Sequence, residues 1–243
     1  MKATHTIIAL VIALTSTGVA YYFSNNHSDT NDAFLKLFVD ITDKDSAQVR
    51  AHEVMTLATN NFTSKEDITI QTEALSNYHI NPIQEFHLPK ENFITGNSQR
   101  RRRTMSKLTK QLDTVIQNMY AEQSAKKQSK IFLPFLHSVN ELSETKAKNK
   151  IIICASDLAE NNKTFTCFDP ISMKLLKKDP DLIEMVLLQG NAVKNLRGMT
   201  IYLVHHPRNE RDDELFNVMA HFYKRFYEAY GAKVYIQDNL LTH

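Results

Sequence analysis

Three apolar runs of strand length, each followed by a more polar stretch, constrain the fold of this chain most strongly. They are AFLKLFVD at residues 33–40, KIIICAS at residues 150–156 and MTIYLVHH at residues 199–206. Apolar runs of this length, with only Lys36 interrupting the first, are typical of strands buried on both faces of a sheet. Because such strands alternate with helical stretches, the sequence predicts an α/β fold, a mostly parallel doubly wound sheet with helices on both faces.

The remaining elements follow from the spacing of apolar residues. Short alternating or apolar stretches predict further strands at residues 67–76, 80–89 and 232–238. Apolar residues at helical spacing predict helices at residues 45–61, within 98–144, at 181–188 and at 212–230. With 243 residues, 42% of them hydrophobic, the chain can bury one sizeable core.

The N-terminal segment has the features of an export or anchoring signal. Lys2 precedes an uncharged, mostly apolar run from Ile7 to Phe23, and acidic residues follow that run. This order of charges directs the rest of the chain away from the cytoplasm. The run is either a retained transmembrane helix that acts as a signal-anchor, or a signal peptide cleaved after the small-x-small pattern Gly18-Val19-Ala20. The sequence leaves both alternatives open.

We therefore expect the chain to have two parts. Residues 1–30 are a signal peptide or transmembrane anchor with a short linker, and residues 31–243 are an exported α/β domain. The expected location is the bacterial cell envelope, with the domain anchored in the inner membrane and facing the periplasm. If the segment is cleaved, the domain is secreted.

Acidic residues close two of the predicted central strands. Asp40 ends the strand at residues 33–40, with Thr42 two positions later, and Asp157 directly follows the run KIIICAS. In doubly wound sheets, ligands bind at the carboxyl ends of the strands, near the point where the strand order reverses. These positions are therefore the first candidates for a functional site.

The order of elements, with Asp-x-Thr closing the first strand and Ser-Asp closing the fourth, resembles the von Willebrand factor type A domain over roughly residues 33–238. The resemblance implies a Rossmann-like fold, binding of a protein partner, and a metal-ion-dependent adhesion site for Mg²⁺ or another divalent cation. Its implied metal ligands are Asp40, Thr42, Asp157 and, in the loop ITGN, Thr95.

Position 44 departs from the pattern of that family, which has a hydroxyl where this chain has Lys44. An ammonium cannot replace an oxygen ligand of Mg²⁺. Either Lys44 turns outward while Asp43 or Ser46 supplies the oxygen, or its charge takes the place of the cation between the carboxylates. A simpler interpretation of DITDKDS is a helix start, with Asp43 or Asp45 as the N-cap of the following helix.

Three further features leave alternatives open. The arginines at residues 100–103 form either a solvated charged face or a grip for phosphate or an acidic partner. His205 and His206 are adjacent on a predicted strand and point to opposite faces, so they cannot readily share one ion. Cys154 and Cys167 flank a polar segment, and they are either bridged across a hairpin or simply buried thiols.

The sequence contains no motif of a common hydrolase, nucleotide-binding loop or zinc protease, and its 5 Gly disfavour a phosphate-cradling loop. A net charge of +2 gives no general preference for nucleic acid. We expect an exported binding module with a protein partner, with no nucleic acid and no small-molecule cofactor, rather than an enzyme. The alternative is an exported Mg²⁺-dependent hydrolase or phosphate-handling enzyme that uses Asp40 and Asp157 as its metal ligands.

Overall fold

The computed structural model of the chain describes residues 32–42, 49–76, 79–80, 83–91, 98–122 and 129–240. The chain divides into Met1–Thr30 and Asn31–His243, and all described residues belong to the second part. The predicted signal peptide or anchor therefore lies outside the described residues. No helix formed by the described residues is both long enough and apolar enough to cross a membrane.

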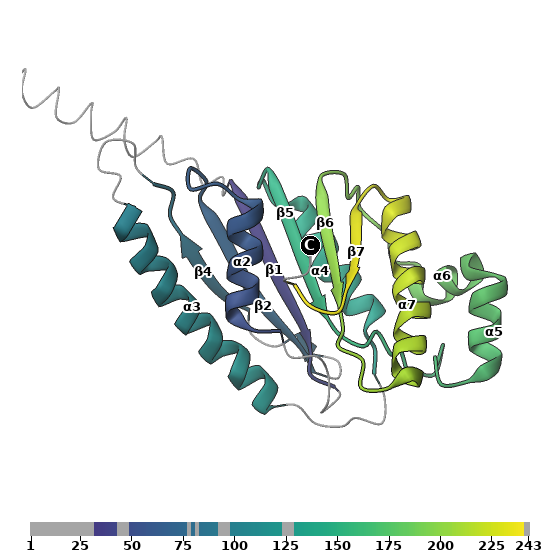
Figure 1. The fold of residues 1–243 in the computed structure, drawn as a ribbon. Helices are drawn as coiled ribbons and strands as arrows, with labels where there is room; N and C mark the ends of the chain where they lie inside the picture. Colours follow the sequence, from purple (N-terminus) through teal and green to yellow (C-terminus); the bar gives the residue numbers. More distant parts are fainter. Residues whose placement is uncertain are drawn as a thin grey trace, which may run out of the picture. The chain divides into compact units, whose positions relative to one another are not determined.

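A mostly parallel sheet forms the centre of the domain (Figure 1). Its strands are β1 (Ala33–Asp40), β2 (Ile68–Ser76), β3 (His79–Ile80), β4 (Gln84–Leu88), β5 (Asn149–Ala155), β6 (Met199–Val204) and β7 (Lys233–Gln237). The strand order is β3-β2-β1-β5-β6-β7, and β4 also pairs with β2. All pairings are parallel except those of β3 and β4 with β2. The prediction of an α/β fold with a mostly parallel sheet is therefore confirmed.

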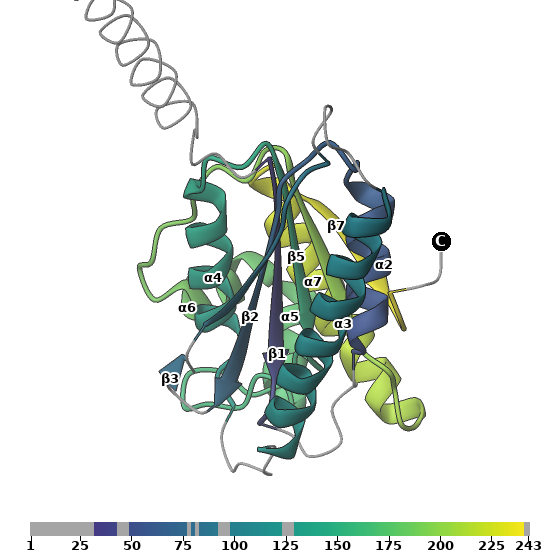
Figure 2. The same cartoon turned by 90° about the vertical axis from the view of Figure 1, so that its left-hand side faces the viewer.

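Helices pack on both faces of the sheet (Figure 2). They are α2 (Ala51–Asn61), α3 (Ser98–Ala121), α4 (Phe132–Glu144), α5 (Pro170–Lys178), α6 (Pro180–Leu188) and α7 (Glu210–Ala229). Because side chains alternate along a strand, Leu35 and Leu37 of β1 join the hydrophobic cluster under α2 and α3. Phe34 and Phe38 of the same strand join the cluster under α4 to α7.

Aromatic side chains hold α4 and α7 together on that second face. Phe132 of α4 lies 5.1 Å from Phe226 of α7 between ring centroids, and Phe135 lies 5.5 Å from Tyr227. Phe135 also contacts Phe38 of β1 at 5.3 Å. These tilted and edge-on contacts fix α7 against the sheet and so position the loops at the strand ends.

Lys36, which interrupts the apolar run of β1, is buried in an ion pair. Its Nζ lies 2.9 Å from Glu73 of β2, and both side chains are almost completely inaccessible to solvent. Glu73 also accepts a hydrogen bond from the hydroxyl of Ser138 in α4, at 2.6 Å. Lys36 reaches Glu141 as well, at 2.6 Å, but that carboxylate is 63% exposed. A lysine is tolerated in this buried strand because Glu73 neutralises it.

The first helix of the domain starts later than its sequence predicts. Helix α2 begins at Ala51 with Arg50 at the N-cap position, and Glu53 accepts the backbone N–H of Arg50 at 3.1 Å. Asp43 and Asp45, which were predicted to cap this helix, lie outside the described residues, and the N-cap position belongs to Arg50 instead. The carboxylate that satisfies a free amide at the helix start comes from inside the first turn.

Helix α5 was not predicted from the spacing of apolar residues. Asp169 and Asp179 each precede a proline at the start of a helix, α5 and α6 respectively. Asp169 accepts two backbone N–H groups of its helix, and Asp179 accepts one. Aspartate at the N-cap followed by proline at the first helical position is a strong helix-start signal. Two such signals ten residues apart would have predicted both helices.

Candidate functional site

The carboxyl ends of β1 and β5 form the point where the strand order reverses. From β1 the chain passes through α2 to β2 on one side, and it later returns to β5 on the other side of β1. Val39 of β1 is paired with Ala155 of β5, so the residues that follow them, Asp40 and Ser156, are neighbours. The sequence motifs at the two strand ends therefore lie together, at the edge where doubly wound sheets bind ligands.

Asp40 is buried and held by hydrogen bonds on both carboxylate oxygens. Its Oδ1 accepts the backbone N–H of Thr42 at 2.9 Å and the hydroxyl of Thr42 at 2.7 Å. Its Oδ2 accepts the hydroxyl of Ser156 at 2.9 Å. These hydrogen bonds fix the direction of the carboxylate and compensate for part of the cost of burying its charge.

The hydroxyl groups around Asp40 have defined donor and acceptor roles. Because the single proton of Thr42 goes to Asp40, the hydroxyl of Ser129, 3.1 Å from that of Thr42, is the donor in their contact. The Ser156 hydroxyl gives its proton to Asp40 and accepts the backbone N–H of Leu158 at 2.9 Å. The network thus links the ends of β1 and β5 to Ser129, which lies three positions before the start of α4.

Asp157 lies next to this network on a tight turn. Its Oδ1 accepts the backbone N–H of Ala159 at 2.8 Å, and the side chain is partly exposed. Leu158 between them has a φ of 57°, in the left-handed region that non-glycine residues rarely adopt. Burial of its side chain in the hydrophobic cluster under α4 and α7 offsets that conformational cost.

Glu160, which the sequence did not single out, is a third carboxyl group near this edge. Its Oε2 accepts the backbone N–H groups of Ile131 and Phe132 at 2.8 and 2.9 Å, and Asn162 donates to its other oxygen. Burial raises the pKa of Glu160, hydrogen bonds from these donors oppose the rise, and the charge of Asp40 adds to it. Glu160 therefore caps the start of α4 from a loop far along the chain.

The structure brings together part of the predicted metal site. Asp40 and Thr42 are in direct contact, Asp157 is adjacent through Ser156, and Thr95 and Lys44 lie outside the described residues. Within the described ranges, no group of three or more His, Cys, Asp or Glu side chains is arranged to hold a metal ion. The described side-chain atoms at this edge that could bind a metal are carboxylate and hydroxyl oxygens, which are the hard ligands that Mg²⁺ prefers.

The two cysteines are free, buried thiols. Cys154 lies within β5 and Cys167 lies in the loop before α5, and both belong to the cluster under α4 and α7. Burial raises the pKa of the Cys154 thiol well above its usual value, and burial raises that of Cys167 to about 12. Of the two alternatives from the sequence, the structure contains the buried thiols.

The histidine pair and the arginine run contribute no ligands to this edge. Strand β6 ends at Val204, so both histidines follow the strand instead of lying on it as predicted. His205 is buried with its Nε2 3.2 Å from Asp212, whereas His206 is exposed. Arg101 is half-buried and donates to the carbonyl oxygen of Pro89. The other arginines of the run 100–103 are exposed on α3. Arg101 therefore anchors the start of α3.

In comparisons with known proteins, no family model matches the chain, and no curated protein matches it at a significant level. The geometry of the site is therefore the basis for a functional proposal.

Proposed function

We propose that residues 31–243 form an exported, type A-like binding module, which engages a protein partner through a divalent cation at the carboxyl edge of the sheet. One observation carries this proposal. Hydrogen bonds join Asp40, Thr42 and Ser156 at the reversal point between β1 and β5, and Asp157 is adjacent. Both motifs that resemble the type A family lie at this position, where sheets of this class bind ligands.

The oxygen atoms at this edge are of the kind that binds a divalent cation. Asp40, Thr42 and Asp157 would hold it, together with Thr95 from the loop outside the described residues. Bound there, Mg²⁺ supplies positive charge and open coordination positions, which an oxygen of a protein partner can fill. The contribution of the chain is preorganisation, because the hydrogen bonds from Thr42 and Ser156 already fix the Asp40 carboxylate.

A hydrolase at the same edge needs a base or nucleophile beside the cation. Glu160 already accepts two backbone N–H groups of α4 and a side-chain amide. His205 is buried against Phe216 and paired with Asp212. Since both groups serve packing and capping, the geometry supports a binding module better than the hydrolase alternative.

Melting curves with and without Mg²⁺ test the proposal on the fragment 31–243, which contains both hydrophobic clusters. A ligand that binds only the folded state stabilises it by RT ln(1 + [L]/Kd), or about 1.4 kcal/mol at a concentration tenfold above Kd. For a domain of this size, that gain raises the melting temperature by roughly 3–6 °C. Wild type should show this rise.

Two substitutions and a control assign the response to this edge. Asp157→Asn keeps an acceptor for the N–H of Ala159 but removes the charge, so it should abolish the rise. Lys44→Ser restores the hydroxyl of the type A pattern and should enlarge it. Asp113→Asn, on the exposed side of α3, should respond like wild type. A wild type that ignores Mg²⁺ would overturn the proposal, and destabilisation by Asp157→Asn would then assign the place of the cation to Lys44.

A further inference from the structure

Large apolar side chains are exposed on and beside the pair of helices α5 and α6. They are Phe168 at 54%, Ile171 at 77%, Leu175 at 37%, Leu182 at 40% and Met185 at 70% exposure. Elsewhere in the described ranges, only Ile83 and Tyr235 are large apolar residues exposed to this degree. Single exposed apolar residues are ordinary, and of these five only Phe168 also lines a cavity against α7.

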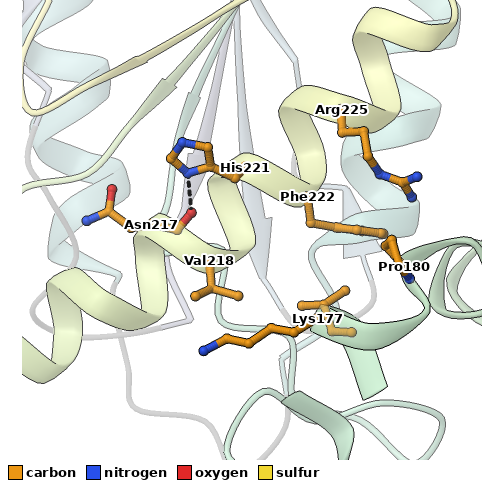
Figure 3. Close-up of a pocket in the computed structure, with 8 residues that line it drawn as sticks. Lys177, Pro180, Asn217, Val218, His221, Phe222 and Arg225 are labelled. Atoms are coloured by element: carbon orange, nitrogen blue, oxygen red, sulfur yellow. Dashed lines mark hydrogen bonds between the residues drawn. The ribbon is translucent and has the colours of Figure 1, made fainter. Parts of the chain in front are cut away.

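A groove runs between this helix pair and α7 (Figure 3). It has a cavity volume of about 490 Å³. Its apolar surface comes from Leu176, Val218 and Phe222, and its polar rim includes Lys177 and His221. The ring of His221 donates a hydrogen bond from Nδ1 to the carbonyl oxygen of Asn217 at 2.7 Å, which turns the ring along α7.

A second cavity extends the groove toward the start of α7. Its volume is about 220 Å³, and it shares Lys177 and Val218 with the first. Phe168 and Arg211 lie along it. On α7 the two cavities together reach from Arg211 to Arg225, which at 1.5 Å per residue is roughly 21 Å, or about four turns of a helix.

The charged residues that line the groove are Lys177, Arg211 and Arg225, together with one carboxylate, Glu214. Lys174, Lys177 and Lys178 of α5 are exposed, and within the described part of the chain no carboxylate lies within ion-pair distance of them. Arg225 is already paired with Asp181 at 2.5 Å and with Glu184 at 3.7 Å. The lysines therefore remain available to an acidic ligand.

We propose that this groove, between α5–α6 and α7, docks an acidic amphipathic helix of a partner protein. The apolar stripe of such a helix covers Phe168, Val218 and Phe222, and its carboxylates face Lys177 and the neighbouring lysines. A helix fits better than an extended peptide, because the groove walls are helices and offer no free strand edge for backbone pairing. The groove shares no residue with the carboxyl-edge site, so this proposal stands independently of the proposed function.

Synthetic peptides of about 15 residues, enough for four turns, provide the probe. One carries leucine at helical spacing with glutamate at the remaining positions, and a second carries lysine in place of glutamate. Fluorescence anisotropy measures their binding to the fragment 31–243. The acidic peptide should bind, and the basic peptide should not.

Matched variants locate the binding. Phe168→Asp and Lys177→Glu change exposed side chains in the groove and should weaken the acidic peptide by about tenfold or more. Ile83→Asp and Lys107→Glu make the same changes at exposed positions elsewhere, and they should leave its affinity unchanged.

Four results would overturn the proposal. The first is that the acidic peptide fails to bind at about 1 mM, which corresponds to a free energy of only −4.1 kcal/mol. The second is that the groove variants bind it as wild type does. The third is that phosphatidylglycerol vesicles, rather than the acidic peptide, recruit the domain and that Phe168→Asp abolishes this recruitment, which would assign the surface to a membrane. The fourth is that sedimentation shows a dimer of the wild type that Phe168→Asp abolishes, which would assign the surface to a second copy of the chain.

Discussion

Replacing Lys36 by methionine tests the internal ion pair of the sheet. In the wild type, the Glu73 carboxylate lies 2.9 Å from Nζ of Lys36. The substitution keeps a long side chain in β1 but leaves this carboxylate buried without its cation. Breaking a buried pair by removing one partner costs about 3–5 kcal/mol. For a domain of this size that loss lowers the melting temperature by roughly 6–20 °C. The contact of Lys36 with Glu141 adds little, because that carboxylate is 63% exposed.

A second substitution separates the charge from the packing. In Lys36→Met/Glu73→Gln the uncharged amide still accepts the hydroxyl of Ser138, so most of the lost stability should return. Lys194→Met serves as the control, because its partner Glu144 is 60% exposed and such pairs contribute about 1 kcal/mol or less. Thermal and urea unfolding of these variants measure the differences. If Lys36→Met costs no more than Lys194→Met, the buried pair does not have the energetic role assigned to it.

Three further outcomes follow from the structure and the sequence. Burial raises the pKa of Glu160 in the folded state above 4.5, so its contribution to stability is fully present below that pH and declines as the pH rises through the folded pKa. The melting temperature of Glu160→Gln should therefore rise relative to that of wild type between about pH 4 and pH 7.5. A difference in melting temperature that stays the same across this range would refute the prediction. Thiol counting should find Cys154 and Cys167 both reactive after unfolding without reductant and both unreactive in the native domain, whereas an absence of reactive thiols after unfolding would show a bridge. A reporter fused after His243 of the full chain should be active only outside the cytoplasm, and cytoplasmic activity would refute export.

Local patterns predicted the sheet because its central strands are apolar on both faces. The runs at residues 33–40 and 150–156 needed no knowledge of their partners, and the position of Asp40 beside Ser156 follows from the reversal of strand order. The same patterns did not reveal Glu160, which caps α4 from 28 residues away. A hydrogen bond between residues so distant leaves no periodic trace in the sequence.

Polar residues near strand ends and helix starts were harder to interpret. Asp43 and Asp45 have the right chemistry for an N-cap, but the helix starts at Ala51, where Glu53 satisfies the Arg50 amide. The pairing of Lys36 with Glu73 was also not predictable, because it depends on the register of β1 with β2 and on where α4 places Ser138. Tertiary packing decides these contacts, and a single sequence does not encode them in its local spacing.

Calorimetric titration of the fragment 31–243 with Mg²⁺, and separately with Mn²⁺, tests most directly whether the carboxyl edge is a cation site. Asp40, Thr42 and Asp157 as ligands predict a saturable heat with one ion per domain, lost in Asp157→Asn and retained in Asp113→Asn. No saturable heat in the wild type, or the same heat in Asp157→Asn, would contradict the account.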